Sequence, residues 1–284
     1  MSTQSVGYVK RGFVHSPHGN IEYRESGDGP PLVLLHSTPS SSAQYQGAFP
    51  YLDDRVRAIA MSSMGYGASD RPPHPYKSIH EFAQCVVWLM DGLGLERASV
   101  FGSHTGAVIA TEVAAGWPER VDRLIVEELF NWGTPARFAV HRRLHQHPEH
   151  EDGSHLAESW RQAHGWLGAG GMGRAEDEVR QAFIDSVTAH AGPPTDVYDG
   201  MSWGGAAPWS MCHYSTWEAL PKIQAPTLVI HGANSELGRA HDRIVAELAR
   251  ARGIRPPAEN QYDWRVDPEL WSREIRAFLD DPGI

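Results

Sequence analysis

The sequence predicts an α/β protein whose mostly parallel, twisted sheet is flanked by helices and interrupted by one inserted, mainly helical segment. Apolar runs alternate with helix-like stretches over residues 30–130, which favours parallel strands joined by right-handed crossovers. The run PPLVLLHS at 30–37 is apolar until its polar end, as in a strand buried on both faces. The alternation stops near Phe130 and resumes at 225.

The first half of the chain supplies most of the expected sheet. Two antiparallel strands are expected around a turn at SPHGN, residues 16–20. Ser78 is expected to cap a helix, with Glu81 completing a capping box. The expected strands lie at 7–14, 20–26, 30–37, 55–63, 97–102 and 120–128, and the expected helices at 41–52, 78–93 and 104–117.

The second half predicts an insertion followed by the end of the sheet. Residues 131–219 are rich in His, Trp and Gly and favour short helices and loops, so we expect them to form a helical cap. Residues 1–130 and 220–284 would then form the core domain. After it we expect a strand at 225–233, helices at 239–253 and 268–279, and a short strand between them near 254–262.

Composition and charge exclude several classes of protein. The chain has 284 residues, a formal net charge of −10 and two cysteines. This charge disfavours nucleic acid and anionic membranes as partners. No run approaches ~18 consecutive apolar residues, and the N-terminus lacks the apolar run of a signal peptide. We therefore expect a cytoplasmic protein without a disulfide framework.

The stretch SVFGSHTG at 99–106 predicts a strand end, a tight turn and a helix start. The pattern G-x-S-x-G holds a nucleophile in this layout, and its glycines allow strand and helix to approach closely. Here Gly102 and Gly106 occupy the glycine positions, and His104 stands where serine belongs.

Four motifs in the same order resemble those of the α/β-hydrolase superfamily with an inserted cap. They are LLHSTP at 34–39, MGYGASDRP at 64–72, the turn around His104 and PTLVIHGAN at 226–234. The resemblance covers nearly the whole chain outside the cap. It implies an α/β-hydrolase fold, with His36 as the structural histidine of the first loop.

The triad that this resemblance implies is incomplete. The position of the usual acid holds Ser235, and the position of the usual histidine holds Gln261, with no histidine after His241. In dehalogenase-like members the acid instead follows the strand after the elbow helix, where Glu128 lies. Glu128 is therefore expected to support His104, with Glu236 and Asp263 left open as alternatives.

A histidine at this turn has a chemical use of its own. The dipole of the following helix disfavours imidazolium, whereas Glu128 would favour it, so we expect the pKa of His104 near neutrality. A neutral imidazole acts as a base or a nucleophile without a partner to deprotonate it. The backbone N–H groups of Thr38 and Thr105 are expected to form the oxyanion hole.

Three functions follow from these residues. In the first, His104 hydrolyses an ester, thioester or lactone of a small hydrophobic or aromatic carbonyl compound. In the second, His104 abstracts a proton in a cofactor-independent lyase, isomerase, cyclase or oxygenase. In the third, the protein binds a ligand without catalysis. No phosphate loop or dinucleotide fingerprint occurs, so no cofactor is expected, and a homodimer is an open alternative to a monomer.

Polar and aromatic residues outside the elbow complete the expected site. Aromatic side chains in a cap often line the substrate pocket. His141 and His145 have a zinc-compatible spacing, but their charged flanks favour a solvated surface, and no metal is expected. The expected substrate-binding residues are Ser37, Trp203, Trp209, His213 and Trp217.

Overall fold

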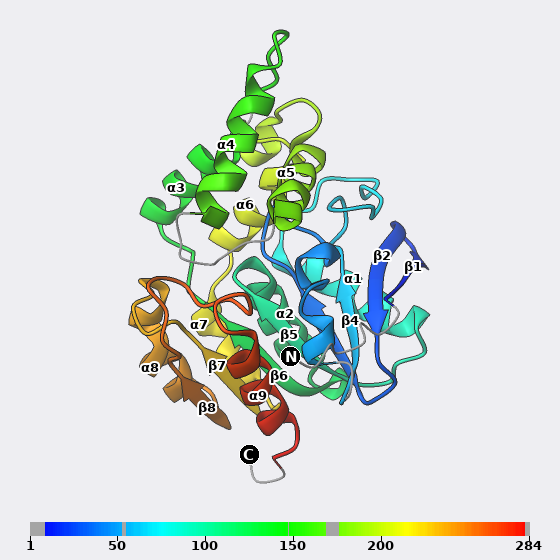
Figure 1. Cartoon of the computed structure of the whole chain (residues 1–284), viewed down its shortest axis with the longest axis vertical. Helices are drawn as coiled ribbons and strands as arrows, with labels where there is room; N and C mark the ends of the chain where they lie inside the picture. Colours follow the sequence, from blue (N-terminus) through cyan, green and yellow to red (C-terminus); the bar gives the residue numbers. More distant parts are fainter. Residues whose placement is uncertain (1–8, 53–54, 147, 169–175, 282–284) are drawn as a thin grey trace.

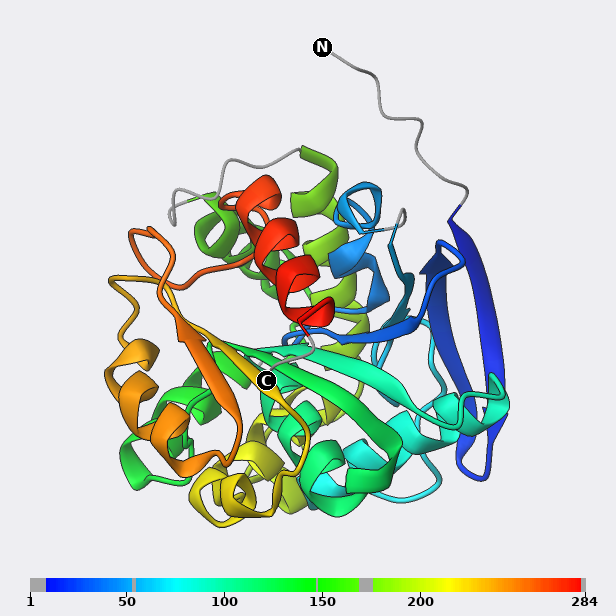
Figure 2. The same ribbon diagram turned by 90° about the horizontal axis from the view of Figure 1, so that it is seen from below.

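The computed structural model describes residues 9–52, 55–146, 148–168 and 176–281. Within these residues, eight strands form one sheet in the order β1-β2-β4-β3-β5-β6-β7-β8. Figure 2 shows the sheet with helices on both faces. The strands are β1 Lys10–Ser16, β2 Gly19–Ser26, β3 Pro31–Leu35, β4 Arg57–Met61, β5 Ala98–Ser103, β6 Val121–Glu127, β7 Thr227–Ile230 and β8 Ala251–Ile254.

The sheet is parallel from β4 to β8, as the sequence predicts. Leu34 of β3 pairs with Ala60 of β4 on one side and with Phe101 of β5 on the other. Only the first two strands break this pattern, because β1 and β2 form a hairpin that closes at Ser16 and Gly19, and β2 runs antiparallel to β4. The carboxyl ends of β3, β5, β6 and β7 therefore meet at one edge.

Helices cover both faces of the sheet. Ser78 caps the first helix, because its Oγ accepts the Glu81 N–H at 3.3 Å and its hydroxyl donates to the Glu81 carboxylate at 2.9 Å. The α-helices are α1 Ile79–Gly92, α2 Thr105–Gly116, α3 Pro135–His145, α4 Ser154–Gly168, α5 Glu176–His190, α6 Ala206–Cys212, α7 Thr216–Ala219, α8 His241–Glu247 and α9 Pro268–Leu279.

The hydrophobic core is divided in two by the sheet. Val33 and Leu35 of β3 belong to the cluster that packs on α1 and α2, whereas Leu32 and Leu34 belong to the cluster that packs on α9. This alternation follows from the two-residue period of a strand. All four side chains are buried, so β3 is covered on both faces, as its continuous apolar run predicts.

Two expected elements differ in the structure. The helix expected at 41–52 consists of two short 3₁₀ helices, Ser42–Tyr45 and Phe49–Tyr51, the second with Pro50 in its first turn. The helix expected at 239–253 ends at Glu247, and the last strand, β8 at Ala251–Ile254, begins three residues before the range near 254–262 where it was expected. Because β8 is a partly exposed edge strand, its sequence carries no apolar run.

Four of the helices between β6 and β7, α3 to α6, lie beyond the sheet edge where the parallel strands end, whereas α7 lies beside α2. Figure 1 shows α3 to α6 stacked together above the sheet, with α4 reaching furthest from it. Residues 131–219 are called the cap below. In the described part of the chain, no helix is long and apolar enough to cross a membrane.

A buried carboxyl group joins the cap to the core. Asp185 of α5 is 3% exposed and accepts hydrogen bonds from Ser41 Oγ at 2.8 Å and Gln181 Nε2 at 2.8 Å. Burial raises the pKa of this carboxyl group from 3.8 to about 6. The folded protein therefore binds the Asp185 proton more tightly than the unfolded chain does.

Replacing Asp185 tests this connection. The stabilisation from protonating Asp185 is fully present below pH 3.8 and is lost as the pH rises through about 6. Asp185→Asn stays uncharged, so we expect it to remove about 3 kcal/mol of this pH dependence. Urea unfolding of both proteins from pH 4 to 7.5 measures the difference. An identical pH dependence of the two unfolding free energies would contradict the assignment.

Candidate active site

The turn between β5 and α2 holds His104 at the sheet edge in a strained conformation. Its φ is +53° and its ψ is −111°, which non-glycine residues rarely adopt. A Cβ at Gly102 would lie 2.1 Å from the Gly106 carbonyl oxygen, and one at Gly106 would lie 2.1 Å from the Leu35 carbonyl oxygen. The two glycines therefore permit the close packing that the motif predicts.

The His104 ring lies among groups that keep it neutral. Its Nδ1 is 3.4 Å from Thr105 Oγ1, and its ring centroid is 4.7 Å from Trp132 and 6.4 Å from His141. Burial, and then the charges of His141 and Arg137, lower the pKa of His104 from 6.5 to about 3. The expectation of a pKa near neutrality is therefore wrong: among the described residues no counter-charge offsets the desolvation of the ring, and Arg137 adds to its effect.

Glu128 does not supply that counter-charge. Its Oε1 accepts the backbone N–H groups of Gly232 and Tyr262, both at 2.7 Å, and its Oε2 accepts the Ser235 hydroxyl at 2.5 Å. Burial raises the pKa of this carboxyl group. The carboxylate thus joins the loop after β7 to the loop before α9, with both oxygens occupied. Contrary to our expectation, Glu128 connects these two loops and does not lie beside the His104 ring.

The other two candidate carboxylates also have partners elsewhere. Glu236 lies on the surface, 3.5 Å from Arg239. Asp263 forms a 2.8 Å ion pair with the mostly buried Arg265. Neither carboxylate has a contact with His104 among the described interactions, so neither stands where the acid of a triad would lie.

The loop after β3 is organised by His36. Its Nε2 accepts the Ser63 N–H at 3.0 Å, and its Nδ1 lies 2.9 Å from the Ser37 carbonyl oxygen. Burial lowers the pKa of His36 to about 4, so the ring is neutral. Gln44 Oε1 accepts the backbone N–H and hydroxyl of Ser37. These contacts fit the structural role implied for His36 and position the backbone at Thr38.

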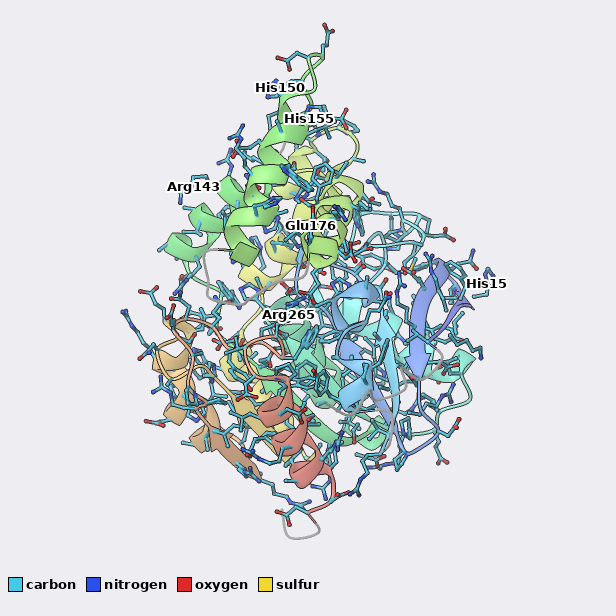
Figure 3. All side chains as sticks on the ribbon, in the orientation of Figure 1. His15, Arg143, His150, His155, Glu176 and Arg265 are labelled. Atoms are coloured by element: carbon cyan, nitrogen blue, oxygen red, sulfur yellow. The ribbon has the colours of Figure 1, made fainter. Side chains whose placement is uncertain are left out.

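A cavity of about 130 Å³ lies between this loop and the cap. The core contributes Ser37, Thr38 and Gln44 to its wall, and Figure 3 shows Arg265 between the cap and the core. His104 is not one of the lining residues, but His141, whose ring centroid is 6.4 Å from that of His104, stacks on the cavity-lining His145 with a centroid distance of 5.9 Å. The other lining residues are Pro39, Ser40, Leu144, Ser159, Gln162, Ala163, Ala182, Ser186 and His190.

The four aromatic residues expected to bind substrate lie outside the wall of this cavity. Trp203 is 9% exposed and packs over Gly65 in the core. Trp209 and His213 stack on each other with a centroid distance of 3.9 Å. The Arg243 guanidinium lies over Trp217, with its Cζ 3.7 Å from the centroid of the Trp217 ring. The structure thus gives these residues packing contacts, and Ser37 alone of the expected substrate-binding residues borders the cavity.

Two histidines of the cap are buried, contrary to what their charged neighbours in the sequence predict. His141 and His145 are 4% and 7% exposed, so the expectation of a solvated surface is wrong. His145 Nδ1 lies 3.3 Å from His190 Nε2, which extends the series of rings into α5. Arg137, His141 and His145 follow one another about one helical turn apart. This spacing is the sequence signal that predicts a shared face of α3. Among the described residues, no three His, Cys, Asp or Glu side chains are placed to hold a metal ion.

Variants of Glu128 test its bracing role. Glu128→Ala leaves the buried N–H groups of Gly232 and Tyr262 without an acceptor, and each such group costs about 1–3 kcal/mol. We expect Glu128→Ala to lower the free energy of unfolding by about 3 kcal/mol or more, and the exposed control Glu236→Ala to change it by less than about 0.5 kcal/mol. Urea unfolding measures both. Equal stabilities of the two variants would contradict the role.

Comparisons with known proteins agree with this architecture. A family model described as alpha/beta hydrolase fold matches residues 30–255. The chain is 25% identical over 272 residues to 2-(acetamidomethylene)succinate hydrolase of Mesorhizobium japonicum, covering 92% of this chain and 91% of that protein. It is 33% identical over 117 residues to haloalkane dehalogenase 2 of Mycobacterium tuberculosis, which spans 41% of each chain.

Solved structures share the fold at lower sequence identity. The enol-lactonase of Burkholderia xenovorans LB400 aligns with a TM-score of 0.75 and 20% identity, covering 95% of this chain and all of that one. The structure of E-2-(acetamidomethylene)succinate hydrolase aligns with a TM-score of 0.77 and 19% identity, covering 96% and 100%. With the match of the family model to most of the chain, these similarities show that the protein belongs to the α/β-hydrolase fold family.

Proposed function

We propose that this protein is a hydrolase of small carbonyl compounds, namely esters, thioesters or lactones, that uses a neutral histidine in place of the serine nucleophile. The observation that carries the proposal is the position of His104 at the apex of the strained elbow, with its pKa lowered to about 3. Relatives in the family that match most of the chain include a hydrolase. An imidazole that is already neutral needs no second histidine to deprotonate it.

The first step we propose is general base catalysis. His104 accepts a proton from a water molecule while the water oxygen bonds to the carbonyl carbon and the carbonyl electrons move onto its oxygen. The imidazolium then returns the proton to the leaving alkoxide or thiolate as the bond to the carbonyl carbon breaks. Direct attack by His104 through an acyl-imidazole is the nucleophilic variant of this route.

The oxyanion formed in that step needs hydrogen-bond donors. Thr105 is the first residue of α2, so its N–H has no partner within the helix. The backbone of Thr38 lies in the loop that His36 organises and borders the cavity. We propose that these two N–H groups stabilise the developing negative charge, which is typically worth about 3 kcal/mol per donor.

Proton abstraction from carbon is the second candidate. It is favoured by the 6.4 Å separation of two neutral imidazoles, His104 and His141, which can act as base and acid in turn. Solvent labels separate the two chemistries. Hydrolysis incorporates ¹⁸O from labelled water into the acid product, whereas proton abstraction exchanges substrate hydrogen with D₂O.

Removing His104 tests the proposed function. On a panel of esters, thioesters and lactones, we expect His104→Ala to lower kcat/KM by about 100-fold or more, because general base catalysis contributes that much. The exposed His150 at the tip of the cap provides the control His150→Ala, which should leave kcat/KM unchanged (Figure 3).

The pH profile adds a second reading. Because the pKa of His104 is about 3, the free enzyme holds the ring as a base throughout pH 5 to 9. We therefore expect that protonation of His104 causes no fall in kcat/KM within that range. Wild-type turnover in His104→Ala would contradict the proposal, as would the absence of turnover in the wild-type protein.

A further inference from the structure

The face of α3 turned toward the elbow is polar, although it is buried. Arg137, His141 and His145 follow one another at four-residue spacing, so they lie on one side of the helix. His141 and His145 are its fully buried side chains, whereas the apolar Phe138 and Leu144 are only partly buried. A cap helix held by ordinary packing would bury apolar side chains. The polar face therefore indicates a surface made for a ligand.

Arg137 brings a positive charge to this face without a counterion. Its Cζ lies 4.9 Å from the Phe130 ring centroid and 5.3 Å from that of Trp132. Within the described part of the chain it has no carboxylate within ion-pair distance, whereas Arg265 has Asp263 at 2.8 Å. A stacked guanidinium with free N–H groups matches a planar anion that can accept two hydrogen bonds.

His141 adds a buried ring with unused hydrogen-bonding capacity. It is 4% exposed, and neither Nδ1 nor Nε2 has a hydrogen-bond partner among the described residues. Burial and the charge of Arg137 lower its pKa to about 4, so the ring is neutral and offers one N–H donor. Native proteins rarely leave such groups unsatisfied, and a bound ligand would satisfy them.

Trp132 connects these groups to the elbow. Its ring centroid is 4.7 Å from that of His104 and 4.8 Å from that of His141. Arg137 stacks on the same indole ring, and its charge acts on both imidazoles. The Arg137 guanidinium, the His141 ring and the His104 ring therefore form one cluster around the Trp132 indole.

From this arrangement we infer that Arg137 and His141 bind a carboxylate group of the substrate, so that the substrate of His104 is an anionic carbonyl compound. The inference rests on the proposed function and narrows its substrate class. The carboxylate would accept hydrogen bonds from the guanidinium and from the His141 ring, and the carbonyl group would lie toward His104 and the loop at Thr38.

A bound carboxylate would also change the chemistry of His104. Arg137 and burial disfavour the imidazolium, which makes His104 a weak base in the free protein. A negative charge beside the ring favours the imidazolium and raises its basicity. An anionic substrate would thus strengthen the base that acts on it, and a neutral substrate of the same shape would not.

Equilibrium binding tests the inference without turnover. The probes are acetate, succinate and benzoate, each paired with its neutral amide and titrated into protein labelled with ¹³C at histidine Cε1. We expect at least one carboxylate to shift the His104 and His141 resonances and to bind at least 10-fold more tightly than its amide. Arg137→Gln should weaken that binding about 10- to 100-fold, and Arg137→Lys less, because it keeps the charge.

A matched control lies on the same helix. Arg143 is exposed and lies at the outer side of the cap, so Arg143→Gln removes an equal charge without touching the site (Figure 3). It should leave carboxylate binding unchanged. The inference is overturned if no carboxylate binds more tightly than its amide, or if Arg137→Gln and Arg143→Gln bind carboxylates equally well. Arg137→Gln could also lose the binding of amides and carboxylates alike, without rescue by Arg137→Lys. That result would overturn the inference too, because it would mean that Arg137 serves the packing of the cap.

Kinetics separate this inference from the proposed function. With monomethyl and dimethyl succinate as substrates, we expect Arg137→Gln to raise KM for the monomethyl ester at least 10-fold and to remove the preference for the monomethyl ester over the dimethyl ester. The exposed control Arg143→Gln should keep that preference. Turnover of both esters with no preference for the anion would overturn the inference alone. Carboxylate binding without any ester hydrolysis would overturn the proposed function and leave the anion site standing.

Discussion

The close approach of β3, β5 and α2 at the elbow is the constraint on which the site depends. With 2.1 Å between a Cβ at Gly106 and the Leu35 carbonyl oxygen, only glycine lets the helix start directly beneath the strand ends. That packing forces a positive φ on the residue between the two elements. Whatever side chain stands there projects at the sheet edge beneath the cap. In this chain the side chain is an imidazole.

The consequences of that substitution extend through the rest of the site. In the mechanism that we propose, a neutral His104 needs neither a separate base nor the acid that orients it, so the loops that carry them in the family are free for other uses. Here Glu128 joins those two loops through Gly232, Ser235 and Tyr262. The cap supplies the polar groups instead, with Arg137 and His141 on α3 facing Trp132.

Much of this fold could be predicted from the sequence, because buried strands and tight turns leave strong local patterns. The apolar run of β3 and the glycines around His104 are examples, and both lie where they were expected. The edge strand β8 could not be located, because partly exposed positions carry arginine as readily as valine. The position of His104 was predictable, and its electrostatic surroundings were not. Whether Glu128 faces the ring or the loops depends on backbone N–H groups that lie more than 100 residues away in the chain.

The pKa of His104 is the most direct measurement of the central claim that a neutral imidazole replaces the triad. In protein labelled with ¹³C at histidine Cε1, the His104 resonance can be assigned by its loss in His104→Gln and followed from pH 4 to 9. We expect a resonance that stays at the position of a neutral ring throughout this range, since the pKa of His104 is about 3. A titration midpoint between pH 6 and 7.5 would contradict it, because His104 would then have a counter-charge that this structure does not place beside it.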